Sequence, residues 1–307
     1  MIHPYSHWSK WACRITKPEE IQSVLKTAYK LATAGRPGPI TIEFPGSVQM
    51  KTAVLKTLEE IPERGIKEKI PPVYLNKEVQ KAGLEEIVRA LMNAKRPVIY
   101  AGGGIYHSHS AEQLEQFAEQ NDIPYVTTLM LLGAMKKNPL NIGFPGMHGR
   151  VENNLALHNA DVILAIGARL DDRIVGNPEK FAPGAEIYWI EPHFPGIGRV
   201  MAQRVKKTEA DAQDALEYLI EKTAENGKIA GNTQKHAEWR NQIQQWKEKY
   251  PMPHHVPREV IEEIRKNVDR YEPKEPYVAT GVGAHQMFLA EYWTFNPEEG
   301  KKMLLSS

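Results

Sequence analysis

Apolar residues recur with alternating helical and strand spacing along residues 76–225. Apolar runs bounded by turn residues predict strands, and longer stretches with apolar residues three and four apart predict amphipathic helices. The predicted helices are Leu84–Ala94, Ala111–Asn121, Val151–Ala160 and Ala212–Glu225, and the predicted strands are Pro97–Ala101, Ile123–Thr128, Val162–Ala168 and Glu186–Ile190. Strands that alternate with helices of about ten residues are typical of a parallel, doubly wound α/β sheet. This segment is expected to form one complete central domain.

The N-terminal segment, residues 1–50, shows less than a domain needs. A helix is predicted from Ile21 to Leu31 and a strand over Ile40–Pro45, with no strand expected before the helix. One helix and one strand cannot enclose a core. We therefore expect residues 1–50 to be the end of a domain, followed by a linker over residues 51–75 that is rich in Lys, Glu and Pro.

The C-terminal segment shows the beginning of an α/β domain rather than its end. Residues 226–270 are expected to be a linker that carries a polar helix over His236–Tyr250. A strand is predicted over Tyr277–Gly283. Residues 271–307 are therefore expected to be the start of another α/β domain.

Composition narrows the class of partner and the compartment. The 307 residues carry 39 Lys and Arg against 38 Asp and Glu, a formal net charge of +1, so neither nucleic acid nor an anionic membrane is expected as a partner. Cys13 is the only cysteine, no apolar run approaches a membrane span, and the first residues lack the apolar core of a signal peptide, so a cytoplasmic protein is expected. His107 with His109, and His254 with His255, lack acidic or cysteine partners at ligand spacing, so no metal site is expected.

Two of the predicted strands end in glycine and are followed by residues that carry chemistry. Val98–Gly104 ends in three consecutive glycines, and Asp161–Arg173 runs from an apolar strand through Gly167 to a charged triplet at its end. Glycine lets a ligand approach the backbone, and N–H groups at such turns can bind the phosphates of a dinucleotide. The glycines are also compatible with a tight strand–helix turn, and the triplet with a surface ion pair or a helix start. Together the two segments indicate a nucleotide-type cofactor.

Six short motifs in this order are similar to those of acetohydroxyacid synthase (acetolactate synthase), a thiamine-diphosphate-dependent enzyme. They are GRPGP at residues 35–39, AGGG at 101–104, TTLM at 127–130, GMHG at 146–149, GARLDDR at 167–173 and VGAHQM at 282–287. The resemblance implies three domains, of which this chain covers about half the enzyme. Residues 1–50 would be the end of the pyrimidine-binding domain, 76–225 the central Rossmann-like FAD-binding domain, and 271–307 the start of the pyrophosphate-binding domain.

The resemblance also implies which residues hold cofactors. In the family, the central domain binds FAD in an extended pose, as a structural rather than a redox-active group. The positions that match its FAD contacts are Arg36, Gly102, Gly103, Gly104, Thr128, Leu129, Met130, Gly146, Met147, His148, Gly149, Gly167, Ala168, Arg169, Asp171, Arg173, Ile174, Glu191 and Asp211. Val282, Gly283 and His285 match contacts to thiamine diphosphate.

The activity implied by the resemblance is decarboxylation of pyruvate on thiamine diphosphate and condensation with a second 2-oxo acid, in branched-chain amino acid biosynthesis. The family's catalytic glutamate matches a position before Met1 and its Mg²⁺-binding segment one after Ser307, so no residue here is assigned a catalytic role. We expect this chain alone to be inactive, and thiamine diphosphate and Mg²⁺ to bind only together with those regions. We also expect a homo-oligomer, or a complex with a chain that supplies them.

Two other functions stay open from the sequence. The first is another decarboxylase or carboligase of the same superfamily, with a different substrate and no flavin. The second is a non-catalytic nucleotide-binding or interaction module that keeps the central fold, for which FAD or ADP binding without a response to thiamine diphosphate would be diagnostic.

Overall fold

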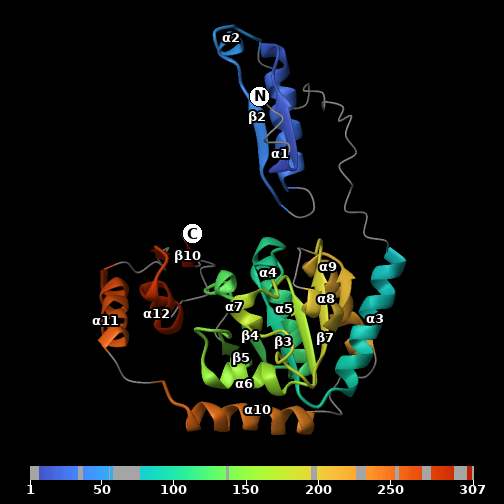
Figure 1. Cartoon of the computed structure of the whole chain (residues 1–307), viewed down its shortest axis with the longest axis vertical. Coiled ribbons are helices and arrows are strands. Elements are labelled where there is room, and N and C mark those ends of the chain that lie inside the picture. Colours follow the sequence, from blue (N-terminus) through green and yellow to red (C-terminus); the bar gives the residue numbers. More distant parts are fainter. Residues whose placement is uncertain are drawn as a thin grey trace. The chain divides into compact units, whose positions relative to one another are not determined.

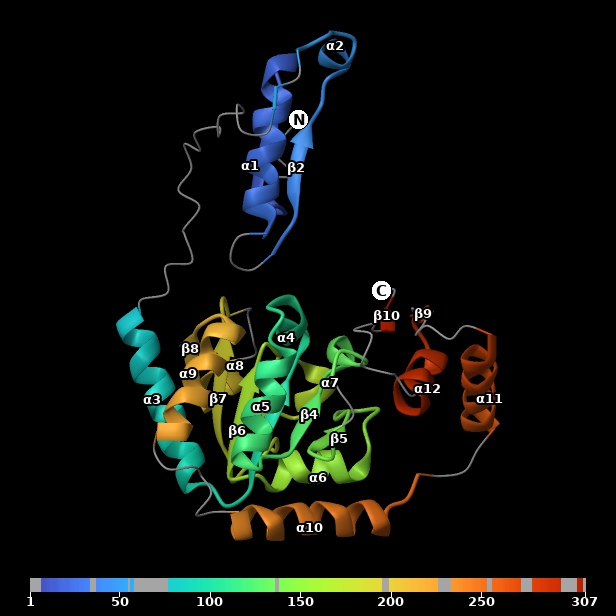
Figure 2. The same cartoon turned by 180° about the vertical axis from the view of Figure 1, so that it is seen from behind.

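The computed structural model of the chain describes residues 7–33, 37–54, 56–57, 77–135, 138–194, 199–225, 233–252, 256–271, 278–293 and 303–305 (Figures 1 and 2). The chain divides into two compact units, Met1–Tyr74 and Leu75–Ser307. No helix among the described residues is long and apolar enough to cross a membrane.

The N-terminal unit is a two-stranded parallel sheet covered by one helix. Its elements are β1 (Trp11–Arg14), a 3-10 turn (Pro18–Glu20), α1 (Ile21–Thr33), β2 (Ile40–Glu43) and α2 (Gly46–Gln49). β1 pairs with β2 with Trp11 opposite Ile40, and Trp11, Cys13 and Ile15 pack against the apolar face of α1. The expectation that no strand precedes the helix is therefore wrong. A four-residue strand has too short an apolar alternation to stand out before its pairing partner is known.

A six-stranded parallel sheet forms the centre of the second unit. Its strands are β3 (Pro97–Ala101), β4 (Tyr125–Thr127), β5 (Asn141–Gly143), β6 (Val162–Ile166), β7 (Glu186–Glu191) and β8 (Val205–Glu209), in the order β5-β4-β3-β6-β7-β8. The chain builds outward from β3 to β5 and then returns to β6 on the other side. In such a sheet, ligands bind beyond the carboxyl ends of the strands where the direction of winding reverses. That switch point lies between β3 and β6.

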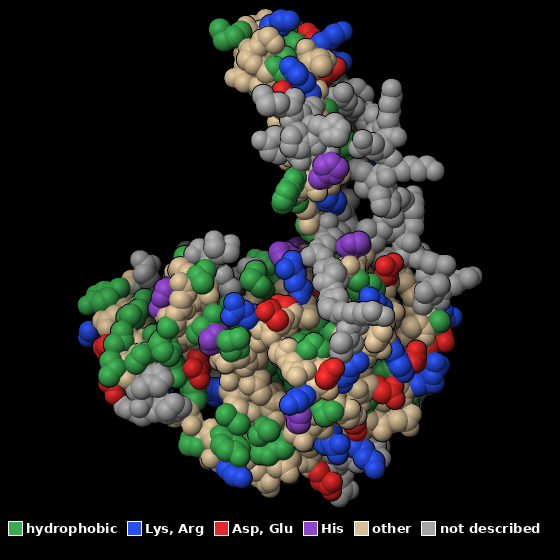
Figure 3. Space-filling model, viewed as in Figure 1, with side chains coloured by type: hydrophobic (Ala, Val, Ile, Leu, Met, Phe, Trp, Pro, Cys, Tyr) green, Lys and Arg blue, Asp and Glu red, His purple; other side chains and the backbone are tan. Residues whose placement is uncertain are grey.

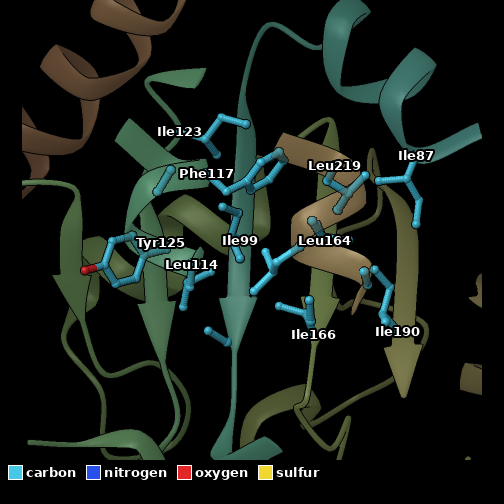
Figure 4. Close-up of a cluster of buried hydrophobic side chains, with 14 of the residues drawn as sticks. Ile87, Ile99, Leu114, Phe117, Ile123, Tyr125, Leu164, Ile166, Ile190 and Leu219 are labelled. Atoms are coloured by element: carbon cyan, nitrogen blue, oxygen red, sulfur yellow. The ribbon is translucent and has the colours of Figure 1, made fainter. Parts of the chain in front are cut away.

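Helices cover both faces of this sheet, which confirms the predicted doubly wound α/β fold. On one face α3 (Lys77–Asn93), α5 (Ala111–Asn121) and α9 (Ala212–Glu225) pack on strand residues such as Ile99 and Leu164 (Figure 4). On the other face α6 (Val151–Asn159) and α10 (Thr233–Lys249) pack on Tyr100 and Trp189. The short helices α4 (Gly103–His107), α7 (Asp172–Val175) and α8 (Arg199–Arg204) follow strand ends.

Helix α10 falls within the stretch expected to be a linker, and its first half is anchored to the amino end of the sheet. The Trp239 indole N–H donates to the carbonyl oxygen of Pro97 at 3.2 Å, and the Nδ1 atom of buried His236 lies 3.1 Å from the carbonyl oxygen of Asn121. The Arg240 guanidinium pairs with the Asp122 carboxylate at 3.2 Å. Trp239 and Ile243 join the same core as Trp189.

The last described elements are α11 (Val256–Tyr271), β9 (Val278–Thr280), α12 (Ala284–Tyr292) and β10 (Met303–Leu305). β9 and β10 pair in parallel, and α11 packs on α12 through Ile261, Tyr292 and Trp293. The other face of α11 leaves Val260, Ile264 and Tyr271 about half exposed or more, in a group of apolar side chains seen at the left of Figure 3.

Candidate functional site at the carboxyl edge of the sheet

The turns after β3 and β6 pack directly on each other at the switch point. The N–H of Gly104 donates to the carbonyl oxygen of Gly167 at 2.8 Å. A Cβ at Gly102 would lie 2.3 Å from that same oxygen, and a Cβ at Gly104 would lie 2.5 Å from the Cα of Gly167. Gly167 itself has φ +56°, in the left-handed region that favours glycine. Gly102, Gly104 and Gly167 are therefore required by the close approach of the two turns, as the tight-turn interpretation predicts.

The segment after β4 borders the same edge. Thr128 follows β4, and Leu129 and Met130 lie in a 3-10 helix, Leu129–Leu131. A Cβ at Gly103 would meet the Cβ of Met130 at 3.0 Å, so this segment lies against the β3 turn. The Thr128 hydroxyl oxygen is buried without a hydrogen-bond partner among the described residues. A buried hydroxyl without a protein partner is free to bond to a group bound at this point.

The loop after β5 joins the segment after β6. The N–H of Met147 donates to the carbonyl oxygen of Arg173 at 2.9 Å, and a Cβ at Gly146 would lie 2.7 Å from the Cδ1 atom of Ile174. The Asn154 side chain makes a reciprocal pair with Gly146, at 2.7 Å to its N–H and 2.9 Å to its carbonyl oxygen. These bonds fix the loop that also carries Gly149 and the exposed side chains of Met147 and His148.

The charged triplet after β6 opens α7. The Asp171 side chain accepts a hydrogen bond from the Arg173 N–H at 3.2 Å, so Asp171 is the N-cap of this helix. The helix-start interpretation of the triplet is therefore correct. Arg169 and Arg173 are both exposed, and neither forms an ion pair within the described part of the chain. Two guanidinium groups without acidic partners at one sheet edge suit a phosphate or pyrophosphate group.

Two acidic residues lie at the far end of the same edge. Glu191 ends β7, and its carbonyl oxygen accepts from the N–H of Ala210 at 3.2 Å. Asp211 follows β8 and caps α9, where its carboxylate accepts from the Gln213 N–H at 2.8 Å. Because the N–H of Gly167 donates to the carbonyl oxygen of Ile190 at 3.1 Å, Glu191 lies next to the β6 turn, and Asp211 lies one strand further along the edge. Carboxylates at this position suit ribose hydroxyls.

Two buried aromatic residues, which the sequence did not single out, support the segment after β6. The Tyr100 hydroxyl donates to the carbonyl oxygen of Arg169 at 2.9 Å, and the Trp189 indole N–H donates to that of Ala168 at 2.8 Å. Burial, with a smaller effect from the Asp171 carboxylate, raises the pKa of Tyr100, so its hydroxyl stays protonated and able to donate. A sequence signal was present, because a buried Tyr or Trp in a strand needs a partner for its polar tip.

The structure thus gathers all but four of the predicted positions along one edge. Arg36 lies outside the described residues. Val282 and Gly283 lie between β9 and α12, and His285 lies in the first turn of α12, next to a separate two-stranded sheet formed by β9 and β10. There the His285 ring approaches the turn, because a Cβ at Gly283 would lie 2.8 Å from its Cε1 atom. Among the described residues, no group of three or more His, Cys, Asp or Glu side chains is placed to hold a metal ion.

Comparison with known proteins defines the class of this fold and edge. Residues 84–219 match the family model described as the thiamine pyrophosphate enzyme, central domain. The match covers the whole sheet and its carboxyl edge, so residues 84–219 form a domain of the kind found at the centre of thiamine pyrophosphate enzymes.

Within that class the chain is similar to acetolactate synthase large subunits. It is 34% identical over 285 residues to the large subunit of Buchnera aphidicola, covering 92% of this chain and 48% of the relative. It is 34% identical over 289 residues to that of Corynebacterium glutamicum (92% and 44%) and 32% identical over 316 residues to the mitochondrial catalytic subunit of Saccharomyces cerevisiae (94% and 44%). The resemblance drawn from the motifs is confirmed. The chain spans about half the length of the curated relatives it matches.

Proposed function

We propose that this chain contributes the central, dinucleotide-binding part of an acetolactate synthase catalytic subunit. In this proposal the whole protein decarboxylates pyruvate on thiamine diphosphate and condenses the two-carbon unit with a second 2-oxo acid, in branched-chain amino acid biosynthesis. The observation that carries it is the similarity to acetolactate synthase subunits over 92% of the chain, joined to a family match that coincides with the doubly wound sheet.

We further propose that the carboxyl edge of the sheet holds FAD. The described residues fit such a group, because the buried Thr128 hydroxyl has no partner and Arg169 and Arg173 have no acidic partner there. The pyrophosphate would be bound by Gly103, the loop from Gly146 to Gly149 and the two guanidinium groups. The ribose hydroxyls would be bound by Glu191 and Asp211. The proposed contact set also includes residues that border the same edge: Leu129, Met130, Met147, His148, Ala168, Asp171 and Ile174.

Four other residues are also proposed to contact cofactors. Arg36 is proposed to reach FAD, and Val282, Gly283 and His285 are proposed to contact thiamine diphosphate. Thiamine diphosphate, with Mg²⁺, supplies the carbanion chemistry when it is bound. The role of the described residues is to bind and orient a dinucleotide at the sheet edge.

The domain division expected from the sequence is kept as part of this proposal. Residues 1–50 would belong to a pyrimidine-binding domain, 76–225 to the central domain and 271–307 to a pyrophosphate-binding domain, joined by residues 51–75 and 226–270. Separate expression of residues 76–250 tests it, because a central domain should melt cooperatively without the flanking segments; the fragment keeps α10, since the first half of that helix packs on the sheet.

Binding of FAD to the purified chain is the experiment that tests the proposal. A yellow protein, or a rise in melting temperature of about 5–10 °C at saturating FAD, is expected. A colourless protein without a shift would favour a flavin-free decarboxylase or carboligase of the same class. A shift with FAD or ADP but no response of any kind to thiamine diphosphate and Mg²⁺ would favour a nucleotide-binding module. The expectation that the chain alone does not convert pyruvate is tested by an acetolactate assay with all three cofactors.

We also propose that the chain associates, as a homo-oligomer or with a second chain. The support is the exposed apolar face of α11, where Val260, Ile264 and Tyr271 flank a surface groove. Exposed apolar groups of this kind commonly mark protein interfaces. Sedimentation velocity of the wild-type chain and of Ile264→Glu tests it. If the wild-type chain is a homo-oligomer, the variant should dissociate. If the wild-type chain is a monomer, association with a second chain is the form of the proposal that stays open.

A further inference from the structure

Tyr100 and Trp189 lie in one row across the centre of the sheet. Tyr100 on β3 is paired with Ala165 on β6, and Ala165 is paired with Trp189 on β7. Both aromatic side chains are fully buried and share one core cluster, so they stand on the same face of the sheet with the small side chain of Ala165 between them. Their polar tips reach the segment that leaves β6.

The Tyr100 hydroxyl and the Trp189 indole N–H donate hydrogen bonds to consecutive carbonyl groups of the segment after β6. The Trp189 Nε1 atom is 2.8 Å from the carbonyl oxygen of Ala168, and the Tyr100 hydroxyl is 2.9 Å from that of Arg169. Neither donor has another acceptor in the described part of the chain. The core therefore fixes the orientation of two successive peptide groups, those between residues 168 and 169 and between 169 and 170.

Fixing these carbonyl groups also fixes the N–H groups of the same peptide planes. In a planar trans peptide the C=O and N–H bonds point in opposite directions, and no peptide bond in the described chain is cis. The N–H groups of Arg169 and Leu170 therefore point away from Tyr100 and Trp189. Neither donates to another described backbone group, although Leu170 is only 4% exposed. Both N–H groups are therefore available to an acceptor outside the described backbone.

We infer that Tyr100 and Trp189 are positioning residues that present the N–H groups of Arg169 and Leu170 to the pyrophosphate of the bound dinucleotide. This inference rests on the proposed dinucleotide site. Adjacent N–H groups with a common orientation bind anions, and the guanidinium groups of Arg169 and Arg173 extend from the same segment. The two aromatic residues act through the backbone and do not touch the ligand themselves.

The test compares binding of ADP with binding of adenosine, which lacks the phosphates. Tyr100→Phe and Trp189→Phe each remove the donor and keep an aromatic ring. We expect each variant to bind ADP roughly tenfold more weakly by isothermal titration calorimetry, the loss expected for one misplaced hydrogen-bonding group, and to keep the wild-type affinity for adenosine. Tyr188→Phe is the matched control, because Tyr188 is buried on the other face, where its hydroxyl bonds to Glu186 at 2.9 Å.

The possible results separate this inference from the function on which it rests. If wild-type protein binds neither FAD nor ADP, the proposed dinucleotide site is wrong. If wild type binds ADP and both variants bind it equally well, the site stands and the positioning role is overturned. A parallel loss of ADP and adenosine affinity also overturns it, since that result indicates general damage to the fold. Should Trp189→Phe not fold, Tyr100→Phe alone decides the question, because it removes a single oxygen atom.

Discussion

The backbone N–H of Gly104 lies 2.8 Å from the carbonyl oxygen of Gly167, and this bond joins the turns after β3 and β6. It spans the point at which the winding of the sheet reverses, where a parallel α/β fold has its binding crevice. The two glycines thus lie at the centre of the candidate site, where their close approach sets the spacing of the two turns.

Gly104→Ala is expected to destabilise the second unit by about 1–3 kcal/mol, the usual cost of overpacking a close contact. The added methyl carbon would lie 2.5 Å from the Cα of Gly167, a backbone atom, and the Gly104–Gly167 hydrogen bond holds the two turns together. The midpoint of urea unfolding measures the loss. Gly184→Ala is the control, because nothing lies within 4 Å of a Cβ at Gly184. Equal midpoints for the two variants would show that the turns do not pack as described.

Sequence periodicity predicted the central elements closely. The bounds of β3, α5 and α9 coincide with the predicted Pro97–Ala101, Ala111–Asn121 and Ala212–Glu225. These elements are either fully buried or strongly amphipathic, so their apolar spacing alone defines them. β5 and β8 were not predicted. β5 is only Asn141–Gly143, and β8 carries Lys206 and Lys207 because it is an edge strand, where charges protect against unwanted pairing.

The candidate site was predictable in its location but not in its inner structure. Glycines and charged residues after consecutive strands indicated the carboxyl edge, and the motifs of the family placed them in order. The roles of Tyr100 and Trp189 were not predictable, because they depend on the register that places both beside Ala165. A sequence shows that each aromatic residue is in a strand but not which carbonyl group its polar tip reaches.

A charged cluster at the start of β7 should make stability depend on pH. The Lys206 ammonium lies 2.8 Å from both Glu86 and Glu186. The hydrogen bond from Lys206 lowers the pKa of Glu186 below its ordinary 4.5, and the bonds to Glu186 and Glu86 raise the pKa of Lys206 above its ordinary 10.5. The carboxylate's contribution is present above pH 4.5 and is lost as the pH falls through the lowered pKa. The ammonium's contribution is present below pH 10.5 and is lost as the pH rises through the raised pKa.

Lys206→Met is therefore expected to lower stability at pH 7 and to lower it by less at pH 3, because the contribution of the Glu186 carboxylate decreases below pH 4.5. Because the groups are largely exposed, solvent screening limits the loss at pH 7 to about 0.2–1 kcal/mol. Urea unfolding of both proteins at the two pH values measures the difference. A deficit of the same size at pH 3 would assign the effect to packing of the lysine stem on the Tyr188 ring, which lies 4.8 Å from the ammonium.

Trp239→Ala is expected to destabilise the second unit by about 3–5 kcal/mol, the usual cost of deleting a buried aromatic side chain. Trp239 is 3% exposed, packs in the core with Trp189, and donates to the carbonyl oxygen of Pro97. Trp246, which meets Trp239 edge to face at 5.6 Å, is only partly buried, so Trp246→Ala should cost clearly less. Thermal unfolding compares the two variants. If both variants lose the same stability, the second half of α10 contributes to the core as much as the first half does.

Arg173→Ala is expected to weaken ADP binding by about tenfold to a hundredfold without lowering stability, the range for a hydrogen bond from a charged donor. Its guanidinium has no acidic partner among the described residues, and its carbonyl oxygen is held by Met147 at 2.9 Å, so it extends from a fixed backbone between two loops of the edge. The loss should shrink as salt is added, because salt screens the attraction between guanidinium and phosphate. Arg89→Ala, on α3, removes an exposed arginine from outside this edge and should bind as wild type does. If both variants weaken ADP binding to the same extent, the anion is held by net charge alone, and the edge after β6 is not its site.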